Sequence, residues 1–210
     1  LSVASFSDQT IQAFVESAGS RAQAPGGGAI QALVAALGTA AAEMAIRFSD
    51  GKDYDPARAL LSEAAHSCAA IRARCLELMD ADAEAFQSVA AAYALPKSTR
   101  AEKAARRDAI RSALIDAART PTALLDAADM LSQTTERIVS AANPQLVADI
   151  AVGALAASAA ARGALLNIEE NLKDDLHSAA RTQAARKTDE IVQRSDAVYR
   201  AARERIVSGS

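Results

Sequence analysis

The stretch DPARALLSEAAHSCAAIRARCLELMDADAEAFQSVAAAYA, from Asp55 to Ala94, decides the fold class of this chain. Its apolar residues recur in alternating steps of three and four, which is the spacing of one face of an α-helix. Asp55 is a favourable N-cap and Pro56 suits the first helical position, so we expect one long helix that begins there. The predicted buried face consists of Leu61, Ala64, Cys68, Ile71, Cys75, Leu78, Asp82, Ala85, Val89 and Ala92.

The sequence on both sides of this stretch predicts further helices and no strand. Alanine is abundant and aromatic residues make up only 3% of the chain, which favours helix over strand. We therefore expect an all-α, antiparallel up-and-down helical bundle of six or seven helices, formed by a single domain over residues 1–210. The other expected helices run from a Ser7 cap to Gly19, from Gly28 to about Phe48, from a capping box at Thr99 and Glu102 to before Pro121, from there to about Ala142, and from Asn143-Pro144 to about Val207 with an interruption near 173–175.

Composition and charge narrow the classes of partner. The chain has 23 basic and 26 acidic residues, so its formal net charge is −3. Half of its residues are hydrophobic, which is typical of a globular rather than a disordered protein. A slightly acidic chain of this kind is not expected to bind nucleic acid.

The sequence also indicates the compartment. The first twenty residues include acidic side chains such as Asp8 and no basic apolar leader, so we expect no secretory signal and a cytoplasmic protein. Cys68 and Cys75 lie on one predicted helix with Cα atoms about 10 Å apart, beyond disulfide reach. The uncharged stretches 22–42 and 150–161 are interrupted or short, so neither is expected to span a membrane.

Asp82 breaks the apolar face of the long helix and is the first candidate functional residue. A carboxylate at a buried position must be paired, hydrogen-bonded or functional, because burying an isolated charge is costly. Two structural interpretations stand beside a catalytic one. Asp82 is either half of a salt bridge between helices, or the helix turns this position towards solvent.

A second broken stripe lies between residues 149 and 171. Small residues in its middle allow a helix or a flat ligand to approach the backbone, and polar residues at its ends supply directed hydrogen bonds. Asn167 and Asn171 also suit a purely structural role, tying adjacent helices together. The stripe consists of Asp149, Gly153, Ala157, Ala160, Ala164, Asn167 and Asn171.

Three weaker signals complete the candidate list. Pro25, Gly26, Gly27 and Gly28 lead directly into a predicted helix, so free backbone N–H groups there are available to an anion or a carbonyl, although a flexible helix entry explains the same residues. Lys97 is a candidate partner for a carboxylate or phosphate, or simply a solvated lysine. The two histidines are isolated and no cluster has metal-ligand spacing, so no metal site is expected.

Five segments occur in a fixed order that is found in one known family. Together they resemble the cyclodeaminase/cyclohydrolase family, which comprises the C-terminal domain of formiminotransferase-cyclodeaminase and stand-alone bacterial methenyltetrahydrofolate cyclohydrolases. The chain departs from the family at Ala29 and Ala148, where serine is usual. The segments are APGGGA (24–29), DADAEAF (80–86), YALPKST (93–99) with Arg106-Arg107 after it, NPQLVADIAVGAL (143–155) and GALLNIEENL (163–172).

The resemblance implies an all-α homodimer that acts on one-carbon tetrahydrofolates without a metal or a bound cofactor, the folate derivative being the substrate. It implies Asp82 as the catalytic carboxylate, with Asp149 as the second candidate. The pterin ring is implied to be bound by Asn143, Asn167 and Asn171. The glutamate tail is implied to pair with Lys97 and Arg106. The implied cleft is bordered by the glycine-rich segment and by Asp82, Lys97, Asn143, Asp149, Asn167 and Asn171.

The expected activity is that of a methenyltetrahydrofolate cyclohydrolase, a metal-independent hydrolase that opens a cyclic amidine by adding water. This reaction is favoured because no formiminotransferase domain accompanies the helical domain in the sequence. The first alternative is a formimidoyltetrahydrofolate cyclodeaminase, which releases ammonia. The second is a non-catalytic helical module that binds a partner or serves as a scaffold.

Overall fold

The computed structural model describes residues 5–208, apart from the side chain of Asp175, and these residues form helices and no strand. Four short 3₁₀ helices connect or precede the α-helices, at Phe6–Asp8 (η1), Lys52–Ala57 (η2), Pro144–Leu146 (η3) and Asp175–His177 (η4). The all-α prediction is confirmed. The α-helices are α1 (Ile11–Ala18), α2 (Gly27–Arg47), α3 (Arg58–Ala94), α4 (Arg100–Ala117), α5 (Arg119–Ile138), α6 (Val147–Asn171) and α7 (Ser178–Ser208).

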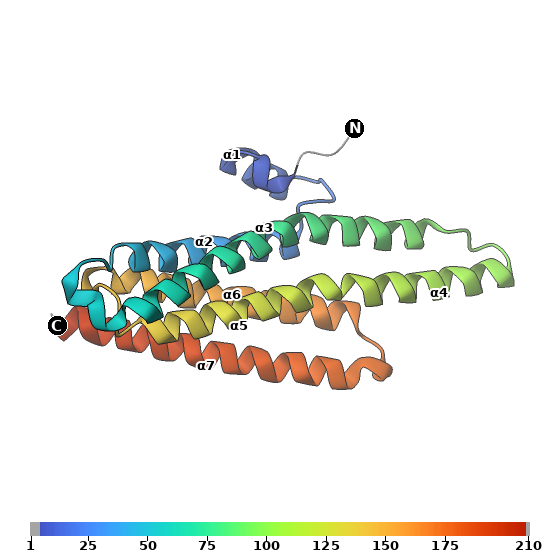
Figure 1. The fold of residues 1–210 in the computed structure, drawn as a ribbon. Coiled ribbons are helices and arrows are strands. Elements are labelled where there is room, and N and C mark those ends of the chain that lie inside the picture. The colour runs from blue at the N-terminus through green and yellow to red at the C-terminus, as the bar shows by residue number, and fades with distance from the viewer. Residues whose placement is uncertain (1–4, 209–210) are drawn as a thin grey trace.

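The helices run up and down along one long axis (Figure 1). Only Ala118, which is itself in the helical region, separates α4 from α5, so the two form one rod antiparallel to α3. α6 packs against α2, α5 and α7 and is the central helix of the bundle. A helix with neighbours on three sides must be apolar around most of its circumference, which explains the run of alanine in α6.

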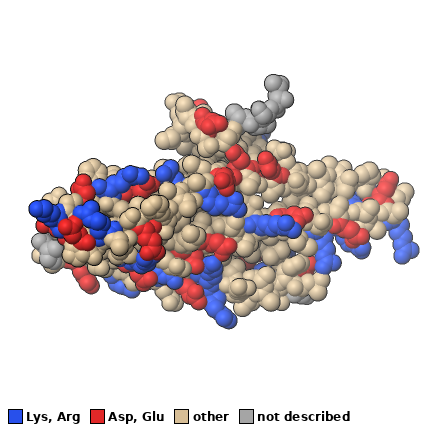
Figure 2. Space-filling view, in the orientation of Figure 1, with Lys and Arg blue, Asp and Glu red and all other residues tan. Residues whose placement is uncertain are grey.

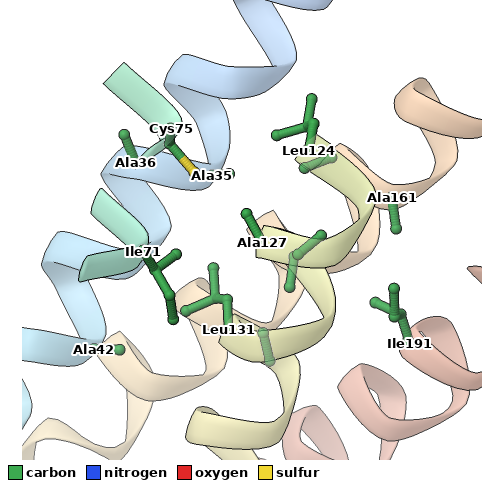
Figure 3. Packing of buried hydrophobic residues seen from close by; sticks show 14 of the residues in the cluster. Ala35, Ala36, Ala42, Ile71, Cys75, Leu124, Ala127, Leu131, Ala161 and Ile191 are labelled. Atoms are coloured by element: carbon green, nitrogen blue, oxygen red, sulfur yellow. The ribbon is translucent and has the colours of Figure 1, made fainter. Parts of the chain in front are cut away.

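The core is built mainly from alanine, with larger side chains placed between the helices. Ile71 of α3, Leu131 of α5 and Ile191 of α7 are each almost completely buried, and Figure 3 shows them between alanines of the neighbouring helices. Gly38 of α2 packs directly on Gly153 of α6, where an added Cβ would be only 2.9 Å from the carbonyl oxygen of Gly38. Small residues therefore let α2 and α6 approach closely.

Two parts of the chain extend from the bundle (Figure 1). The end of α3 and most of α4 form a hairpin beyond the other helices, and Ala117 is the only buried residue of α4. α1 stands apart, above α3. It is held near α3 through η1, where the backbone N–H of Phe6 donates to the Asp80 carboxylate at 2.8 Å.

Several helix limits differ from those predicted. Thr10, not Ser7, caps α1, because Ser7 lies in η1. Asp55 lies inside η2, where its carboxylate pairs with Arg58 rather than capping α3. α5 ends at Ile138, four residues before the predicted Ala142. The capping box at Thr99 and Glu102, the Gly19 stop and the interruption near residue 173 are all confirmed.

Both cysteines are buried free thiols on α3, as their spacing predicts. Burial raises the pKa of the Cys68 thiol and of the Cys75 thiol to about 11, so both stay protonated at neutral pH. On the face seen in Figure 2, positive and negative side chains are interspersed, without one large patch of a single sign.

Two helical stretches are long and apolar enough to cross a membrane by length and composition alone, α2 and Pro144–Asn171. From the sequence, neither region was expected to span a membrane, because only the uncharged stretches 22–42 and 150–161 were considered. The helices that contain most of these residues extend beyond them into charged residues. Of the apolar window in α2, 56% is buried inside the chain, and 44% in the second stretch. Burial of this extent is typical of core helices.

Candidate active site

A cavity of about 430 Å³ opens where the first turn of α2 meets the middle of α3, the junction of α4 and α5, and the end of α6. One side is polar, formed by the glycine-rich turn, Asp82 of α3 and the end of α6. The other is apolar, formed by α3 and α4. Its lining residues are Gln23, Ala24, Gly26, Gly27, Gly28, Asp82, Ala83, Ala85, Phe86, Val89, Tyr93, Leu114, Ala117, Pro121, Asn167, Glu170, Asn171 and Lys173.

Asp82 is in the middle of α3, and its side chain reaches the amino end of α2. Its carboxylate accepts the backbone N–H of Ala29 at 3.1 Å, in the first turn of α2, where the helix dipole also favours a negative charge. Burial nevertheless raises the pKa of the Asp82 carboxyl above its ordinary value, and the hydrogen bond from Ala29 opposes this only in part. Within residues 5–208 Asp82 forms no ion pair, so it is not half of a salt bridge between helices.

The glycines next to Asp82 explain how the carboxylate fits there. A Cβ added at Gly28 would overlap Oδ1 and Cγ of Asp82, whereas a Cβ at Gly27 would meet nothing within 4 Å. Gly28 is therefore needed for close approach of the carboxylate to the backbone of α2. Pro25 is buried just before this turn and does not line the cavity.

The end of α6 supplies polar groups to the cavity. Asn167 and Asn171 are one turn apart, so their side chains leave the same face of the helix. Neither side chain makes a hydrogen bond to another group within residues 5–208, so the interpretation that they tie helices together is not supported. Glu170 and Lys173 stand at the same end and form an exposed ion pair of 2.7 Å.

The sequence identified the apolar wall only in part, since Val89 was placed on the predicted apolar face but Phe86, Tyr93 and Leu114 were not named as lining a site. Phe86, Val89 and Tyr93 follow one another on α3 in steps of three and four, and Leu114 faces the cavity from α4. Phe86 and Tyr93 are 46% and 52% exposed, which is high for large aromatic side chains. The available signal was that Val89 belongs to the predicted apolar face of the long helix, and that Phe86 and Tyr93 each follow a residue of that face by one position, which puts them at its edge.

Arg106 contacts Tyr93 of this wall and does not itself line the cavity. Its guanidinium lies 5.5 Å from the centre of the Tyr93 ring and donates two hydrogen bonds to the Tyr93 carbonyl, at 3.0 and 3.2 Å. Such a cation–π contact restricts the ring. Lys97, in the exposed connection between α3 and α4, does not line the cavity either.

Asn143 and Asp149 lie at the opposite end of the bundle. Asp149 is eighteen residues before Asn167 on α6, which corresponds to about 27 Å along the helix. Asn143 joins the α5–α6 connection to the end of α2, since its Nδ2 donates to the Phe48 carbonyl at 3.1 Å and its backbone N–H donates to Ser49 Oγ at 2.7 Å. Within one chain these two residues are not brought to the cavity.

No group of three or more His, Cys, Asp or Glu side chains suited to a metal ion occurs among the described residues. His177 is instead bound to the Asp174 carboxylate, and His66 to the carbonyl of Ser62 at 2.7 Å. Among the carboxylates that line the cavity, Asp82 is the one whose pKa is raised by burial. The arrangement combines one partly desolvated carboxylate, two amides and an apolar wall, which suits a flat, polar-edged and cationic ligand.

Comparison with known proteins gives three findings. The sequence profile of the family described as Formiminotransferase-cyclodeaminase matches residues 10–190. The chain is 33% identical over 168 residues to formimidoyltransferase-cyclodeaminase of Rattus norvegicus, covering 80% of this chain and 31% of that protein. It is also 33% identical over 167 residues to methenyltetrahydrofolate cyclohydrolase of Methylorubrum extorquens, covering 79% of this chain and 80% of that protein.

A solved structure agrees with the fold. The crystal structure of formiminotetrahydrofolate cyclodeaminase from Thermotoga maritima matches with a TM-score of 0.80, covering 96% of this chain and 98% of that one at 23% identity. At this identity the match concerns the helical architecture. The chain spans about a third of the length of the formimidoyltransferase-cyclodeaminases it matches.

Proposed function

Because the chain belongs to the formiminotransferase-cyclodeaminase family, we propose that it is a methenyltetrahydrofolate cyclohydrolase, which hydrolyses 5,10-methenyltetrahydrofolate to 10-formyltetrahydrofolate. The observation that carries this proposal is the position of Asp82, a carboxylate without an ionic partner in residues 5–208, at the wall of a cavity large enough for a ring system. The substrate is positively charged at its reactive carbon, so it would be the cationic partner that Asp82 does not have in the protein.

The proposed reaction needs one carboxylate and one water molecule. Asp82 attracts the cationic carbon, orients the water and accepts its proton as the new carbon–oxygen bond forms. As the bond between this tetrahedral carbon and N5 breaks, Asp82 returns its proton to N5. The hydroxyl group on the carbon loses its own proton to solvent, which leaves the formyl group on N10 and releases one proton overall. A carboxyl whose pKa is raised by burial is a stronger base than an ordinary Asp.

The polar wall is proposed to orient the pterin. Asn167 and Asn171 each offer both a donor and an acceptor, which matches the amide-like edge of the pterin ring. The apolar wall on α3 accepts the flat faces of the rings. The glutamate tail is proposed to leave the cavity towards the α3–α4 hairpin, where Lys97 is exposed and Arg106 is already engaged with Tyr93.

A second candidate is the cyclodeaminase reaction. It is supported by the 33% identity to formimidoyltransferase-cyclodeaminase, which equals the identity to the cyclohydrolase relative. In that reaction N10 attacks the formimino carbon and ammonia leaves. Both reactions pass through a tetrahedral carbon, so the same Asp82 would serve either one.

Two assays separate these functions. Purified protein is mixed with 5,10-methenyltetrahydrofolate and the near-ultraviolet absorbance of the methenyl compound is followed, with Asp82→Asn as the control. The absorbance falls faster than in buffer if the protein is a cyclohydrolase. Ammonia release from 5-formimidoyltetrahydrofolate instead identifies a cyclodeaminase, and activity in neither assay leaves the non-catalytic module as the function.

We also propose that the enzyme is cytoplasmic, uses no metal or bound cofactor and acts as a homodimer. The dimer is supported by the apolar surface of α2 and α6, which a single chain leaves uncovered.

A further inference from the structure

The apolar wall of the cavity extends well beyond the carboxylate of Asp82. Tyr93 follows Asp82 on α3 by eleven residues, so the two lie about 16 Å apart along the helix. Both nevertheless line the same cavity. A ligand group that contacts Tyr93 is therefore not the ring that reacts beside Asp82, but a group attached to that ring farther along.

Tyr93 presents an aromatic ring at this distal end of the cavity. The residue is 52% exposed, although it lines the cavity and lies in the last turn of α3. A half-exposed ring in a cavity wall offers a flat apolar surface, and aromatic pairs are more stable than the buried area alone predicts. The side chain therefore suits contact with a second aromatic ring.

Lys173 supplies a positive charge at the same end of the cavity. Among the described residues that line the cavity, Lys173 alone is cationic, and it forms an exposed ion pair of 2.7 Å with Glu170. Glu170 raises the pKa of the Lys173 ammonium, and the Tyr93 side chain adds a smaller effect in the same direction, so Lys173 and Tyr93 lie within electrostatic reach of each other. Exposed pairs are weak, so a ligand carboxylate can replace Glu170.

Arg106 of α4 fixes Tyr93 in two ways. Its Nε and Nη2 atoms both donate to the Tyr93 carbonyl, at 3.2 and 3.0 Å, where the end of α3 leaves carbonyl groups without partners inside the helix. Its guanidinium also lies 5.5 Å from the centre of the Tyr93 ring. One arginine therefore holds both the backbone and the ring of Tyr93.

Little else fixes this part of the molecule. The hairpin of α3 and α4 extends beyond the other helices (Figure 1), and Ala117 is the only buried residue of α4. The contact of Arg106 with Tyr93 links the two helices of the hairpin near the mouth of the cavity. The position of the Tyr93 ring should therefore depend on Arg106.

We propose that Tyr93 and Lys173 form a distal subsite for an aromatic ring that carries a carboxylate, and that Arg106 is a positioning residue that holds Tyr93 there. The inference rests on the proposed function, because a tetrahydrofolate substrate carries a benzoyl ring and then a glutamate carboxylate beyond its pterin. It gives Arg106 a different role from the pairing with the glutamate tail that the family resemblance implies.

The first experiment compares two stable probes by titration calorimetry at millimolar concentration. 5-Formyltetrahydrofolate carries the benzoylglutamate group, and 6-methyltetrahydropterin lacks it. Tyr93→Ala, Arg106→Met and Lys173→Met should each weaken binding of the folate by roughly 5-fold or more, and should leave binding of the pterin within about 2-fold.

The matched controls remove a charge from the same hairpin without touching Tyr93. Arg107 is next to Arg106 but pairs with Asp108, and Lys103 is an exposed residue of α4 outside the cavity. Arg107→Met and Lys103→Met should bind both probes as the wild type does. An equal loss of affinity in these controls would mean that the charge of the hairpin matters rather than the hold on Tyr93, and would overturn the role of Arg106.

Two further variants separate positioning from direct pairing. Arg106→Lys keeps the charge but cannot donate the paired hydrogen bonds to the Tyr93 carbonyl, so it should weaken folate binding nearly as much as Arg106→Met. In a Tyr93→Ala background, Arg106→Met should cause no further loss, because the ring that it holds is absent. Full affinity of Arg106→Lys, or losses that simply add, would overturn the positioning role.

Kinetics and spectroscopy give readouts that a purely structural contact would not move. In Arg106→Met the KM for methenyltetrahydrofolate should rise roughly 5-fold or more while kcat stays within about 2-fold, because Asp82 is distant. The chain has three tyrosines and no tryptophan, so 3-fluorotyrosine labelling gives a simple fluorine spectrum in which Tyr93→Phe identifies the Tyr93 signal. This signal should shift when 5-formyltetrahydrofolate is added to the wild type, and a signal that does not shift would overturn the subsite.

Failure of the distal subsite and failure of the proposed function give different results. A wild type that does not bind 5-formyltetrahydrofolate would contradict both. A wild type that hydrolyses methenyltetrahydrofolate, but binds the folate no more tightly in its own form than in the Tyr93→Ala and Lys173→Met variants, would overturn the distal subsite and leave the proposed activity intact.

Discussion

The carboxylate of Asp82 lies against the backbone of Gly28, in a space that no larger residue at position 28 would leave open. The contact joins the middle of the longest helix to the amino end of α2, and it holds the carboxylate at the cavity wall with one backbone hydrogen bond from Ala29. The position of the proposed base therefore depends on a residue that itself has no side chain.

Gly28→Ala should lower turnover by roughly 10-fold or more, because the added methyl group displaces Asp82 from the first turn of α2. Gly27→Ala is the matched control, since its methyl group meets nothing within 4 Å and it lies in the same turn. Initial rates and thermal melts of both variants provide the check. Equal activity of the two would show that the contact does not position the base.

Asp82→Asn should lower kcat by roughly 100-fold or more, because the variant keeps the shape of the side chain but cannot accept a proton. In the wild type the rate should fall on the acidic side as pH drops through the raised pKa of Asp82. This fall in rate at acidic pH should be absent from the residual activity of the variant. A well-folded variant with full activity and an unchanged pH profile would exclude Asp82 as the base and direct attention to Asp149.

Asp82→Asn should also change the pH dependence of stability. The folded-state pKa of Asp82 is raised, so its contribution to stability is fully present below the ordinary Asp pKa of about 4 and is lost as pH rises through the folded pKa. The variant should therefore equal or exceed the wild type in melting temperature at pH 7, and lose this advantage towards pH 4. Destabilisation at pH 7 would indicate a stranded ionic partner instead.

Gly38→Ala should destabilise the protein by about 1–3 kcal/mol, the usual cost of overpacking, because its Cβ would overlap that of Ala156 at the close contact of α2 with α6. Gly19→Ala is the control. Gly19 has helical dihedral angles, and its added Cβ would make an ordinary contact of 3.5 Å. Urea unfolding of both variants measures the difference, and equal stabilities would contradict the described packing.

Turnover should survive exhaustive treatment with EDTA, because the described residues contain no cluster of metal-ligating side chains. The rate with methenyltetrahydrofolate is measured before and after chelation and again after adding zinc. Loss of activity on chelation with recovery on adding zinc would mean that the proposed site is incomplete.

The sequence by itself determined the features that depend on neighbouring residues. The capping box at Thr99, the break after Leu95 and the long apolar period of α3 are local signals, and each is present in the structure. Asp82 was identified for the same reason, since a carboxylate in an apolar period stands out whatever surrounds it. The predicted start of the long helix at Asp55 was wrong, because Asp55 and Pro56 lie inside a 3₁₀ helix that precedes α3, and such 3₁₀ turns are frequent at the ends of α-helices.

Only the tertiary structure decided which of the candidate residues meet. It placed Asp82 beside Asn167 and Asn171 at one cavity, with Asn143 and Asp149 at the other end of α6, because distance along a helix separates residues that share one stripe. It also decided which side of α2 and of α6 faces the core. In an alanine-rich helix both sides are apolar, so the spacing of apolar residues along the sequence does not tell which side faces the core. The close contact at Gly38 turned the small residues to the core and left the large ones outside.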